Sequence, residues 1–263
     1  TIPILANLRL KIIDGKLEVT ATDLEIQIKT FSDLLEIKEE GETTVSARKM
    51  SELCRSLPDN ENVEFSLDNG KLSVSSRNFN ADFATISSDD FPEIEINEEQ
   101  RPISIDSAKF KRLLTKTSFS MASQDVRYYL NGMLLEIGDG KINGVATDGH
   151  RLAFSSVEAG IIDLETRNIL PRKAVLELAK LLSSNNESIE LLIGASYVDI
   201  RTENLRFCSK LIDGKYPDYD KVFPSGDSFP LEVSKELLQS ALTRASVLSN
   251  EKYRGVRFEL TKN

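Results

Sequence analysis

The feature that most restricts how this chain can fold is an internal repeat with a period of about 125 residues. In LRLKIIDGKLEVTATDLEI (8–26) and MLLEIGDGKINGVATDGHRL (133–152), a DGK triplet is followed after the same interval by an ATD triplet. Two further motifs return in the same order: ARK (47–49) as PRK (171–173), and FPEI (91–94) as YPDY (216–219). Because these features recur in one register, the sequence predicts duplicated modules.

The repeat also sets the expected module boundaries. A third round begins at 234–246, a segment that parallels 107–124, and the acidic run EIEINEEQRP (93–102) is expected to be the first connector. We expect module one at 1–100, module two at 101–228 and the start of a third, incomplete module at 229–263.

The local patterns predict an antiparallel α+β architecture. Apolar and polar residues alternate on either side of Asp-Gly in both repeat copies and of Asn-Gly in LDNGKLSV (67–74), which is typical of β-hairpins. Further strands are predicted at 188–202 and 206–212. Helical periodicity and capping residues predict four helices, at 46–57, 107–124, 171–183 and 234–246.

Charge is distributed unevenly along the chain. The net charge is −9, which alone argues against a nucleic-acid partner. All four predicted helices are nevertheless basic: together they carry +9, which leaves −18 for the rest. If the modules place their helices on one side, that side attracts a polyanion through phosphate contacts that carry no sequence information. The cations concerned are Arg48, Lys49, Lys109, Arg112 and Lys116.

No motif of intrinsic catalysis stands out. His150 with Asp148 and a serine could make a hydrolase, but no GxSxG elbow is present, and a lone histidine is more often a packed or hydrogen-bonded side chain. One histidine and the distant Cys54 and Cys208 do not make an ordinary zinc site, so we expect no metal and no cofactor. Reduced thiols, the lack of a membrane span and the lack of a signal peptide predict a cytosolic protein.

A binding role fits the second repeat copy better. Gly149 removes a side chain where a partner could approach, and Leu130, Leu152, Val222 and Pro217 could form an apolar groove for a short peptide. The alternative is that these residues only pack between modules. A repeat scaffold that binds proteins and not DNA also stays open.

The segments QDVRYYLNGML, VATDGHRLA, PRK, KLIDGKYPDY and LSNEKYRGVR resemble the sliding clamp family, the beta subunits of bacterial DNA polymerase III. The resemblance covers the whole chain. It implies tandem clamp-fold domains in a homodimeric ring, with basic helices lining a central hole and sheets outside. The ring encircles duplex DNA without catalysis. It tethers the alpha subunit of the replicative polymerase, the clamp loader and other motif-bearing partners in the bacterial cytoplasm.

The resemblance also implies roles for individual residues. Lys221 stands where the family often has arginine, and Ala81 where some members have a bulky apolar residue. Against the family pattern the chain starts inside module one and ends early in module three, so a fragment with an incomplete groove and no stable closed ring is expected. The implied DNA contacts are Gln124, Tyr128, Tyr129, Arg172 and Lys173. The implied peptide groove is Tyr129, Leu130, Thr147, Gly149, His150, Arg151, Leu152, Pro217, Lys221 and Val222. The implied subunit interface is Phe83 against Val247 and Leu248.

Overall fold

A computed structural model describes residues 2–59, 61–94, 102–160, 164–182, 185, 187–224, 226, 230–249 and 255–259. The chain divides into two compact units, Thr1–Tyr216 and Pro217–Asn263, and each is described by itself. Most of the predicted connector at 93–102 lies outside the described residues. No helix of the described part is long and apolar enough to cross a membrane.

Module one of the first unit is a succession of hairpins with one α-helix. Its elements are η1 (Pro3–Ala6), β1 (Asn7–Ile13), β2 (Lys16–Thr22), β3 (Ile26–Asp33), β4 (Glu42–Ser46), α1 (Ala47–Ser56), β5 (Glu64–Asp68), β6 (Lys71–Ser76) and β7 (Phe79–Ala84). The predicted hairpin turns are present, since Asp14 and Gly15 both have positive φ, as do Asn69 and Gly70. Ser46 caps α1 by accepting a hydrogen bond from the Lys49 N–H at 3.5 Å.

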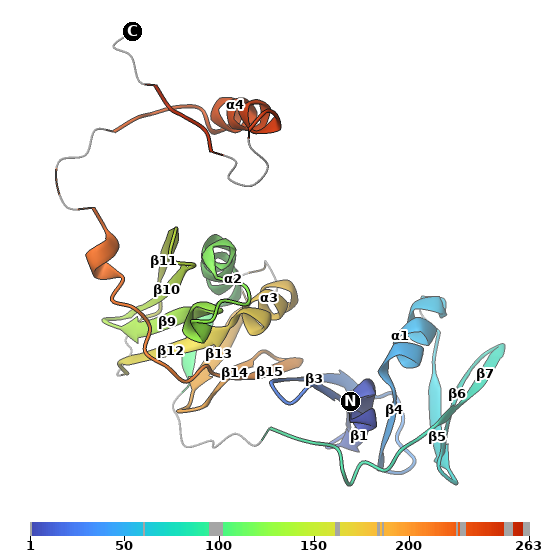
Figure 1. Cartoon of the computed structure of the whole chain (residues 1–263). Coiled ribbons are helices and arrows are strands. Elements are labelled where there is room, and N and C mark those ends of the chain that lie inside the picture. The colour runs from blue at the N-terminus through green and yellow to red at the C-terminus, as the bar shows by residue number, and fades with distance from the viewer. Residues whose placement is uncertain are drawn as a thin grey trace. The chain divides into compact units, whose positions relative to one another are not determined.

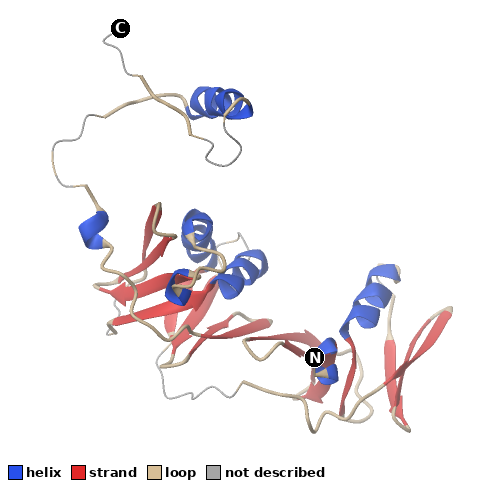
Figure 2. Ribbon diagram, in the orientation of Figure 1, coloured by secondary structure: helices blue, strands red, loops and turns tan. Residues whose placement is uncertain are grey.

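Module two repeats this order behind an additional strand and helix. Its elements are β8 (Ile103–Asp106), α2 (Ser107–Thr117), η2 (Ser118–Ser120), η3 (Tyr128–Leu130), β9 (Gly132–Gly138), β10 (Lys141–Thr147), β11 (Leu152–Glu158), β12 (Thr166–Pro171), α3 (Arg172–Leu181), β13 (Ser188–Ile193), β14 (Tyr197–Arg201) and β15 (Leu205–Lys210). The run β9–β15 matches β1–β7 element for element, so the predicted duplication is confirmed. Figure 2 shows the helices and strands of both modules by type.

Helix boundaries differ from the prediction where side chains intervene. The helix predicted at 107–124 ends at Thr117, whose hydroxyl donates to the Leu113 carbonyl at 2.8 Å and to the Met133 sulfur at 3.3 Å. A 3₁₀ turn follows it. Pro171 is the N-cap of α3 rather than part of its first turn.

The second unit contains η4 (Asp220–Val222) and α4 (Lys235–Val247), which corresponds to the fourth predicted helix. Ser234 caps α4 through its contact with the Leu237 N–H at 3.4 Å. Residues 255–259 have no regular structure.

One antiparallel sheet runs through both modules of the first unit. Its strand order is β4-β1-β2-β3-β15-β14-β13-β8, beside a four-stranded sheet β11-β10-β9-β12 and a three-stranded sheet β5-β6-β7 (Figure 1). The modules join where β3 pairs with β15, with Ile28 opposite Phe207 and Gln27 opposite Cys208.

The register shows that all three helices of this unit pack on the same face of the eight-stranded sheet. Residues paired across neighbouring strands share a face. Leu10 lies opposite Val19, which lies opposite Thr30. Ile28, two residues from Thr30 on the same strand, lies opposite Phe207, which lies opposite Ile200. Leu10 and Val19 belong to the core that holds Met50 of α1, whereas Ile28, Phe207 and Ile200 belong to the core of α2 and α3. The common placement that the charge pattern required is therefore present, as Figure 1 also shows.

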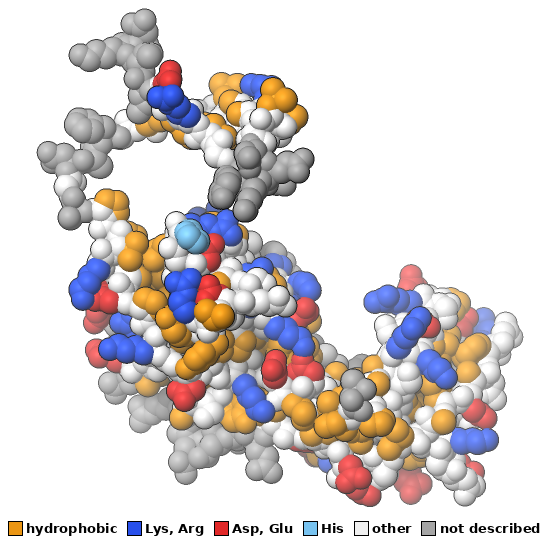
Figure 3. All heavy atoms as spheres, in the orientation of Figure 1, with side chains coloured by type: hydrophobic (Ala, Val, Ile, Leu, Met, Phe, Trp, Pro, Cys, Tyr) orange, Lys and Arg blue, Asp and Glu red, His pale blue; other side chains and the backbone are white. Residues whose placement is uncertain are grey.

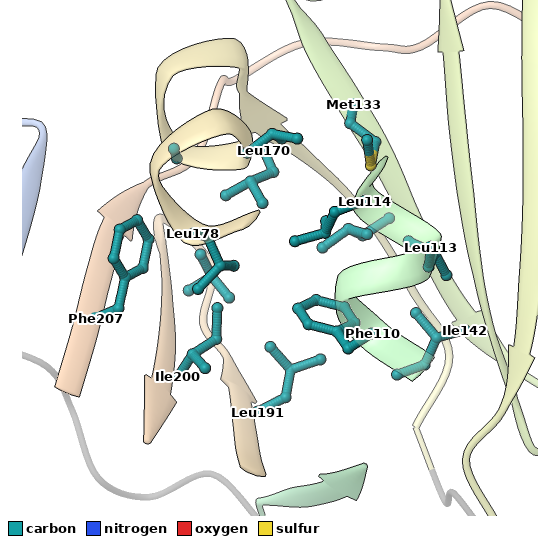
Figure 4. Packing of buried hydrophobic residues seen from close by; sticks show 14 of the residues in the cluster. Phe110, Leu113, Leu114, Met133, Ile142, Leu170, Leu178, Leu191, Ile200 and Phe207 are labelled. Atoms are coloured by element: carbon teal, nitrogen blue, oxygen red, sulfur yellow. The ribbon is translucent and has the colours of Figure 1, made fainter. Parts of the chain in front are cut away.

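The larger core lies in module two, where α2 and α3 contact each other and the four-stranded sheet, and α2 also contacts β8 of the eight-stranded sheet. Phe110, Leu113, Leu114 and Leu178 are fully buried. In Figure 4 Phe110 lies by Leu191, Leu178 by Ile200 and Leu113 by Ile142. Phe110, Leu113 and Leu114 thus form the buried apolar face of α2. The amphipathic spacing fixes which face of each helix turns inward, and the cations take the other face.

Candidate nucleic-acid interface and partner groove

The clearest cationic surface lies on α2. Asp106 accepts a hydrogen bond from the Lys109 backbone N–H at 2.8 Å and so fixes the start of the helix. Lys109, Arg112 and Lys116 follow at helical spacing and are exposed. Within the described residues none of these three has an ion-pair partner, so their charges remain available to an anion.

The cations of α1 and α3 are partly neutralised. Arg48 pairs with Glu52 at 2.9 Å, and Lys180 with Glu177 at 2.9 Å. Lys173 pairs with Asp23 of module one, and this contact raises the pKa of Lys173. Lys49 is exposed. Figure 3 shows Lys and Arg side chains on this side of the first unit, over α1 and beside α2 and α3.

The segment between α2 and β9 lies against the start of α3. The Arg172 guanidinium donates to the Met121 carbonyl at 3.1 Å, so this side chain is half-buried and supports the segment. Gln124 has a positive φ of 59° and is exposed. Tyr128 and Tyr129 meet edge to face with ring centroids 5.9 Å apart, and Tyr128 remains 57% exposed. Such aromatic edges can contact sugars and bases.

The loop between β10 and β11 holds most of the expected groove residues that belong to the first unit. The Thr147 hydroxyl donates to the Arg151 carbonyl at 2.7 Å and accepts from the Gly149 N–H at 3.0 Å. Asp148 accepts the backbone N–H groups of His150 and Arg151, each at 3.0 Å. These bonds fix the backbone on either side of Gly149, whose φ is +88°. Leu130, the floor of the expected groove, is 2% exposed, and Leu152 is half-buried.

Two arginines hold this loop from either side. Arg127 binds Asp125 through two nitrogens and donates to the Asp148 carbonyl at 3.3 Å. Its contact lowers the pKa of Asp125 to about 2. Arg151 binds the Asp148 carboxylate at 3.0 Å and lies over the Phe119 ring at 5.7 Å.

The pKa of Asp148 is likewise below its usual value. Partial burial would raise it, but the backbone N–H groups of His150 and Arg151 and the Arg151 side chain outweigh burial. The loop is therefore held by charge-assisted bonds at neutral pH.

The remaining groove residues, Pro217, Lys221 and Val222, belong to the second unit. Lys221 pairs with Asp218 at 2.7 Å, and Val222 is 63% exposed. The expected groove residues are therefore divided between the two units. Tyr216, at the end of the first unit, accepts a hydrogen bond from the Thr147 N–H at 3.1 Å, and burial raises its pKa to about 12.

The expected interface residues are also divided between the units. Phe83 lies on β7 and is 9% exposed, packed with Leu72 and Val74. Ala81 is half-buried on the same strand. Val247 and Leu248 of the second unit are 75% and 94% exposed.

The hydrolase alternative finds no support at His150. Asp148 accepts the His150 backbone N–H, so it fixes the loop and not the imidazole. No cluster of three metal-binding side chains occurs in the described part of the chain.

Sequence reasoning missed Arg127, Asp125 and Phe119 as parts of this site. Asp125 and Arg127 stand two residues apart in the quoted QDVRYY motif, and this spacing alone permits the Asp125 carboxylate to accept the Arg127 N–H at 2.8 Å. Phe119 carried no such signal, because its contact with Arg151 joins segments far apart in the sequence.

Comparison with known proteins gives a consistent result. Family models described as DNA polymerase III beta subunit, N-terminal domain, and DNA polymerase III beta subunit, central domain, match residues 1–95 and 104–218. A beta sliding clamp of Vibrio cholerae is 43% identical over 100% of this chain and 72% of that protein. A beta sliding clamp of Pseudomonas aeruginosa is 40% identical over 99% of this chain and 71% of that protein.

The fold agrees with solved structures of the same kind. The crystal structure of the DNA polymerase III subunit beta from Pseudomonas aeruginosa superposes with a TM-score of 0.91 at 40% identity. The match covers 96% of this chain and 69% of that one.

Proposed function

The chain belongs to the DNA polymerase III beta subunit family, the beta sliding clamps, and we propose that it holds duplex DNA against the helix-bearing face of its long sheet. A sliding clamp is an accessory subunit of the polymerase and not an enzyme. DNA and the polymerase are its partners.

The observation that carries the proposal is the common face of α1, α2 and α3. The sheet register puts their apolar sides on one surface, so their cationic sides share the direction away from it. The opposite face of the sheet has its own ion pairs, such as Arg206 with Asp199 at 3.1 Å. A phosphate backbone is therefore attracted mainly on the helix side, by contacts that do not depend on sequence.

We propose that the ring closes by the same kind of strand pairing that joins the two modules. β3 of module one pairs with β15 of module two, and β7 is the repeat equivalent of β15. Among the described strands β7 forms the outer edge of its sheet. We propose that the third module of a second subunit meets this edge, which makes Phe83 part of a homodimer interface with Val247 and Leu248 of the partner chain.

The loop of Gly149 is proposed as part of the groove for the alpha subunit of the polymerase, the clamp loader and other motif-bearing proteins. Gly149 has no side chain to obstruct a peptide, and Leu130 and Leu152 offer apolar contact. Pro217, Lys221 and Val222 of the second unit are proposed to contact the same partner proteins. We expect this activity in the bacterial cytoplasm.

The DNA proposal is tested by fluorescence anisotropy of a labelled duplex at several salt concentrations. The variant carrying Lys109→Glu, Arg112→Glu and Lys116→Glu should lose at least about tenfold in affinity. Its slope of log affinity against log salt should become shallower by about 2.7, because each phosphate contact contributes about 0.9.

A matched control reverses three cations on strands, Lys71, Lys141 and Lys210, and should keep most of the binding. Two duplexes of unrelated sequence should bind equally. If the α2 variant kept the affinity and the salt slope of the unchanged protein, α2 would not be a DNA surface. For an assembled ring, retention on circular DNA with loss from linear ends tests encirclement.

A further inference from the structure

The loop between β2 and β3 in module one has the same hydrogen-bond framework as the Gly149 loop. The Thr22 hydroxyl donates to the Ile26 carbonyl at 2.9 Å and accepts from the Leu24 N–H at 3.1 Å. Asp23 accepts the N–H groups of Glu25 and Ile26 at 3.0 and 2.7 Å. Leu24 stands at the position of Gly149 and also has a positive φ, 76°. The duplication has therefore preserved the scaffold of the proposed groove at a second place.

A pocket of about 300 Å³ lies beside this second loop. Its apolar lining comes from Leu24, from Pro92 and Ile94 of the segment after β7, and from Tyr197 of module two. Pro92 and Ile94 belong to FPEI (91–94), the repeat of YPDY (216–219), so the pocket uses the same two sequence features as the groove. It is thus located at the junction of modules one and two.

The segment that closes the pocket is held firmly on the sheet. The Ile94 N–H donates to the Gln27 side chain at 2.9 Å, and Arg9 lies over the Phe91 ring at 5.6 Å. Gln27, Cys208 and Asp199 lie opposite one another across three strands, on the face away from the helices. Tyr197 pairs with Lys210, and this pair lies two residues along the strands from the pair Asp199–Cys208. Tyr197 and Lys210 therefore lie on the same face. A ligand here leaves the DNA-binding face free.

The charge of the pocket favours an anion. Glu93 lines it, but its carboxylate already contacts Lys29 at 3.2 Å and Arg9, and these cations hold its pKa below the usual value although burial would raise it. Lys210 also lines the pocket, is exposed and has no ion-pair partner among the described residues. Its ammonium group is the available charge.

We propose that this pocket binds a short peptide segment that presents an aliphatic side chain next to a carboxylate. The aliphatic group contacts Leu24, Pro92 and Ile94, and the carboxylate pairs with Lys210. The assignment of a peptide, rather than another small anion, rests on the proposed function of the Gly149 groove. Because Leu24 occupies the place of a glycine, the pocket accepts one anchor side chain where the groove accepts a longer motif.

Methyl NMR of the whole chain separates the two sites. The probes are acetyl-Leu-Asp-amide and its neutral counterpart acetyl-Leu-Asn-amide, added at millimolar concentration. The methyl groups of Leu24 and Ile94 report on the pocket, and those of Leu130 and Leu152 report on the groove. We expect saturable shifts at Leu24 and Ile94, with the aspartate probe binding several times more tightly than the asparagine probe.

Variants test the charge. Lys210→Glu should lower the affinity for the aspartate probe about fivefold or more, the scale of an exposed ion pair. Lys71→Glu makes the same charge change on β6 and should leave the titration unchanged. A Lys210→Glu variant with unchanged affinity, or shifts confined to Leu130 and Leu152, would overturn the pocket proposal. The second result would leave the proposed clamp function standing, since that depends on the groove and on the separate DNA titration.

Discussion

Leu24 and Gly149 occupy equivalent positions in two loops with the same hydrogen bonds, and their φ angles are 76° and 88°. Glycine adopts this left-handed conformation without a steric penalty, whereas an L-residue with a Cβ atom loses about 1–2 kcal/mol. Module one therefore tolerates a strained leucine where module two has kept a glycine. The difference gives the two loops different surfaces on one scaffold.

Gly149→Ala should destabilise the loop of module two. A Cβ atom would lie 3.1 Å from two nitrogens of Arg127, in addition to the conformational cost. We expect a loss in the free energy of unfolding that exceeds the conformational cost of about 1–2 kcal/mol, and weaker binding of groove ligands. Gly15→Ala is the control, because Gly15 has a φ of +79° and open space around its Cβ position. Equal losses in both variants would show that the Arg127 contact has no effect.

Gly144→Ala should destabilise the core of module two. A Cβ atom at this position would lie 2.5 Å from Cδ2 of the buried Leu113, so α2 has to shift away from β10. Overpacking of this kind costs about 1–3 kcal/mol, measurable by chemical denaturation. Gly41→Ala is the control, because nothing lies within 4 Å of a Cβ atom at Gly41. Its free energy of unfolding should stay near that of the unchanged protein. An unaffected Gly144→Ala variant would mean that α2 is not packed this closely.

Acid should release the segment that closes the module-one pocket. Burial would raise the pKa of Glu18, but Lys29, Arg9 and Thr20 together lower it below the ordinary 4.5. A lowered pKa in the folded state means that the stabilisation is complete above about pH 4.5 and is lost as pH falls through the lowered value. Because Arg9 and Lys29, the partners of Glu18, also hold Glu93 of that segment, we expect a lower hydrogen-exchange protection factor at the Ile94 N–H in this range.

Glu18→Gln tests the source of that acid dependence. Between pH 5 and pH 3, about two units around the ordinary pKa of a glutamate, the free energy of unfolding should change less in this variant than in the unchanged protein. Glu64→Gln is the control, since Glu64 forms an exposed pair with Lys38 at 2.9 Å. Parallel pH curves for Glu18→Gln and the unchanged protein would contradict the role of Glu18.

Asp23→Asn should increase the affinity for duplex DNA. Asp23 neutralises Lys173, so removing its charge frees a cation on the helix-bearing face. The slope of log affinity against log salt should become steeper by about 0.9, the value of one additional phosphate contact. Asp33→Asn removes the partner of Lys16 on the sheet and should have little effect on DNA affinity or on its salt dependence. If both variants bound DNA alike, Lys173 would not reach the phosphates.

Particular residues show why parts of the fold were predictable. Phe110, Leu113 and Leu114 recur at helical spacing, and Asp-Gly and Asn-Gly mark hairpin turns, because these signals act within a few residues. The end of α2 at Thr117 was not predicted, because the chain continues directly into a 3₁₀ turn at Ser118–Ser120 and the residue pattern does not separate the two kinds of helix. The pairing of Arg151 with Phe119 and of Lys173 with Asp23 was not predictable, because it depends on tertiary contacts.

The sequence by itself determined the duplicated modules, the types of their elements and the excess of cations on the helices. Repeats, periodicity and charge can be recognised along the chain without knowing which residues meet in space. Only the tertiary structure decided that β3 pairs with β15 and that three helices share one face of a continuous sheet. It also decided which basic side chains are neutralised by acidic side chains. Strand pairing and side-chain packing join residues far apart in the sequence. No local pattern specifies which distant edge or charge will meet.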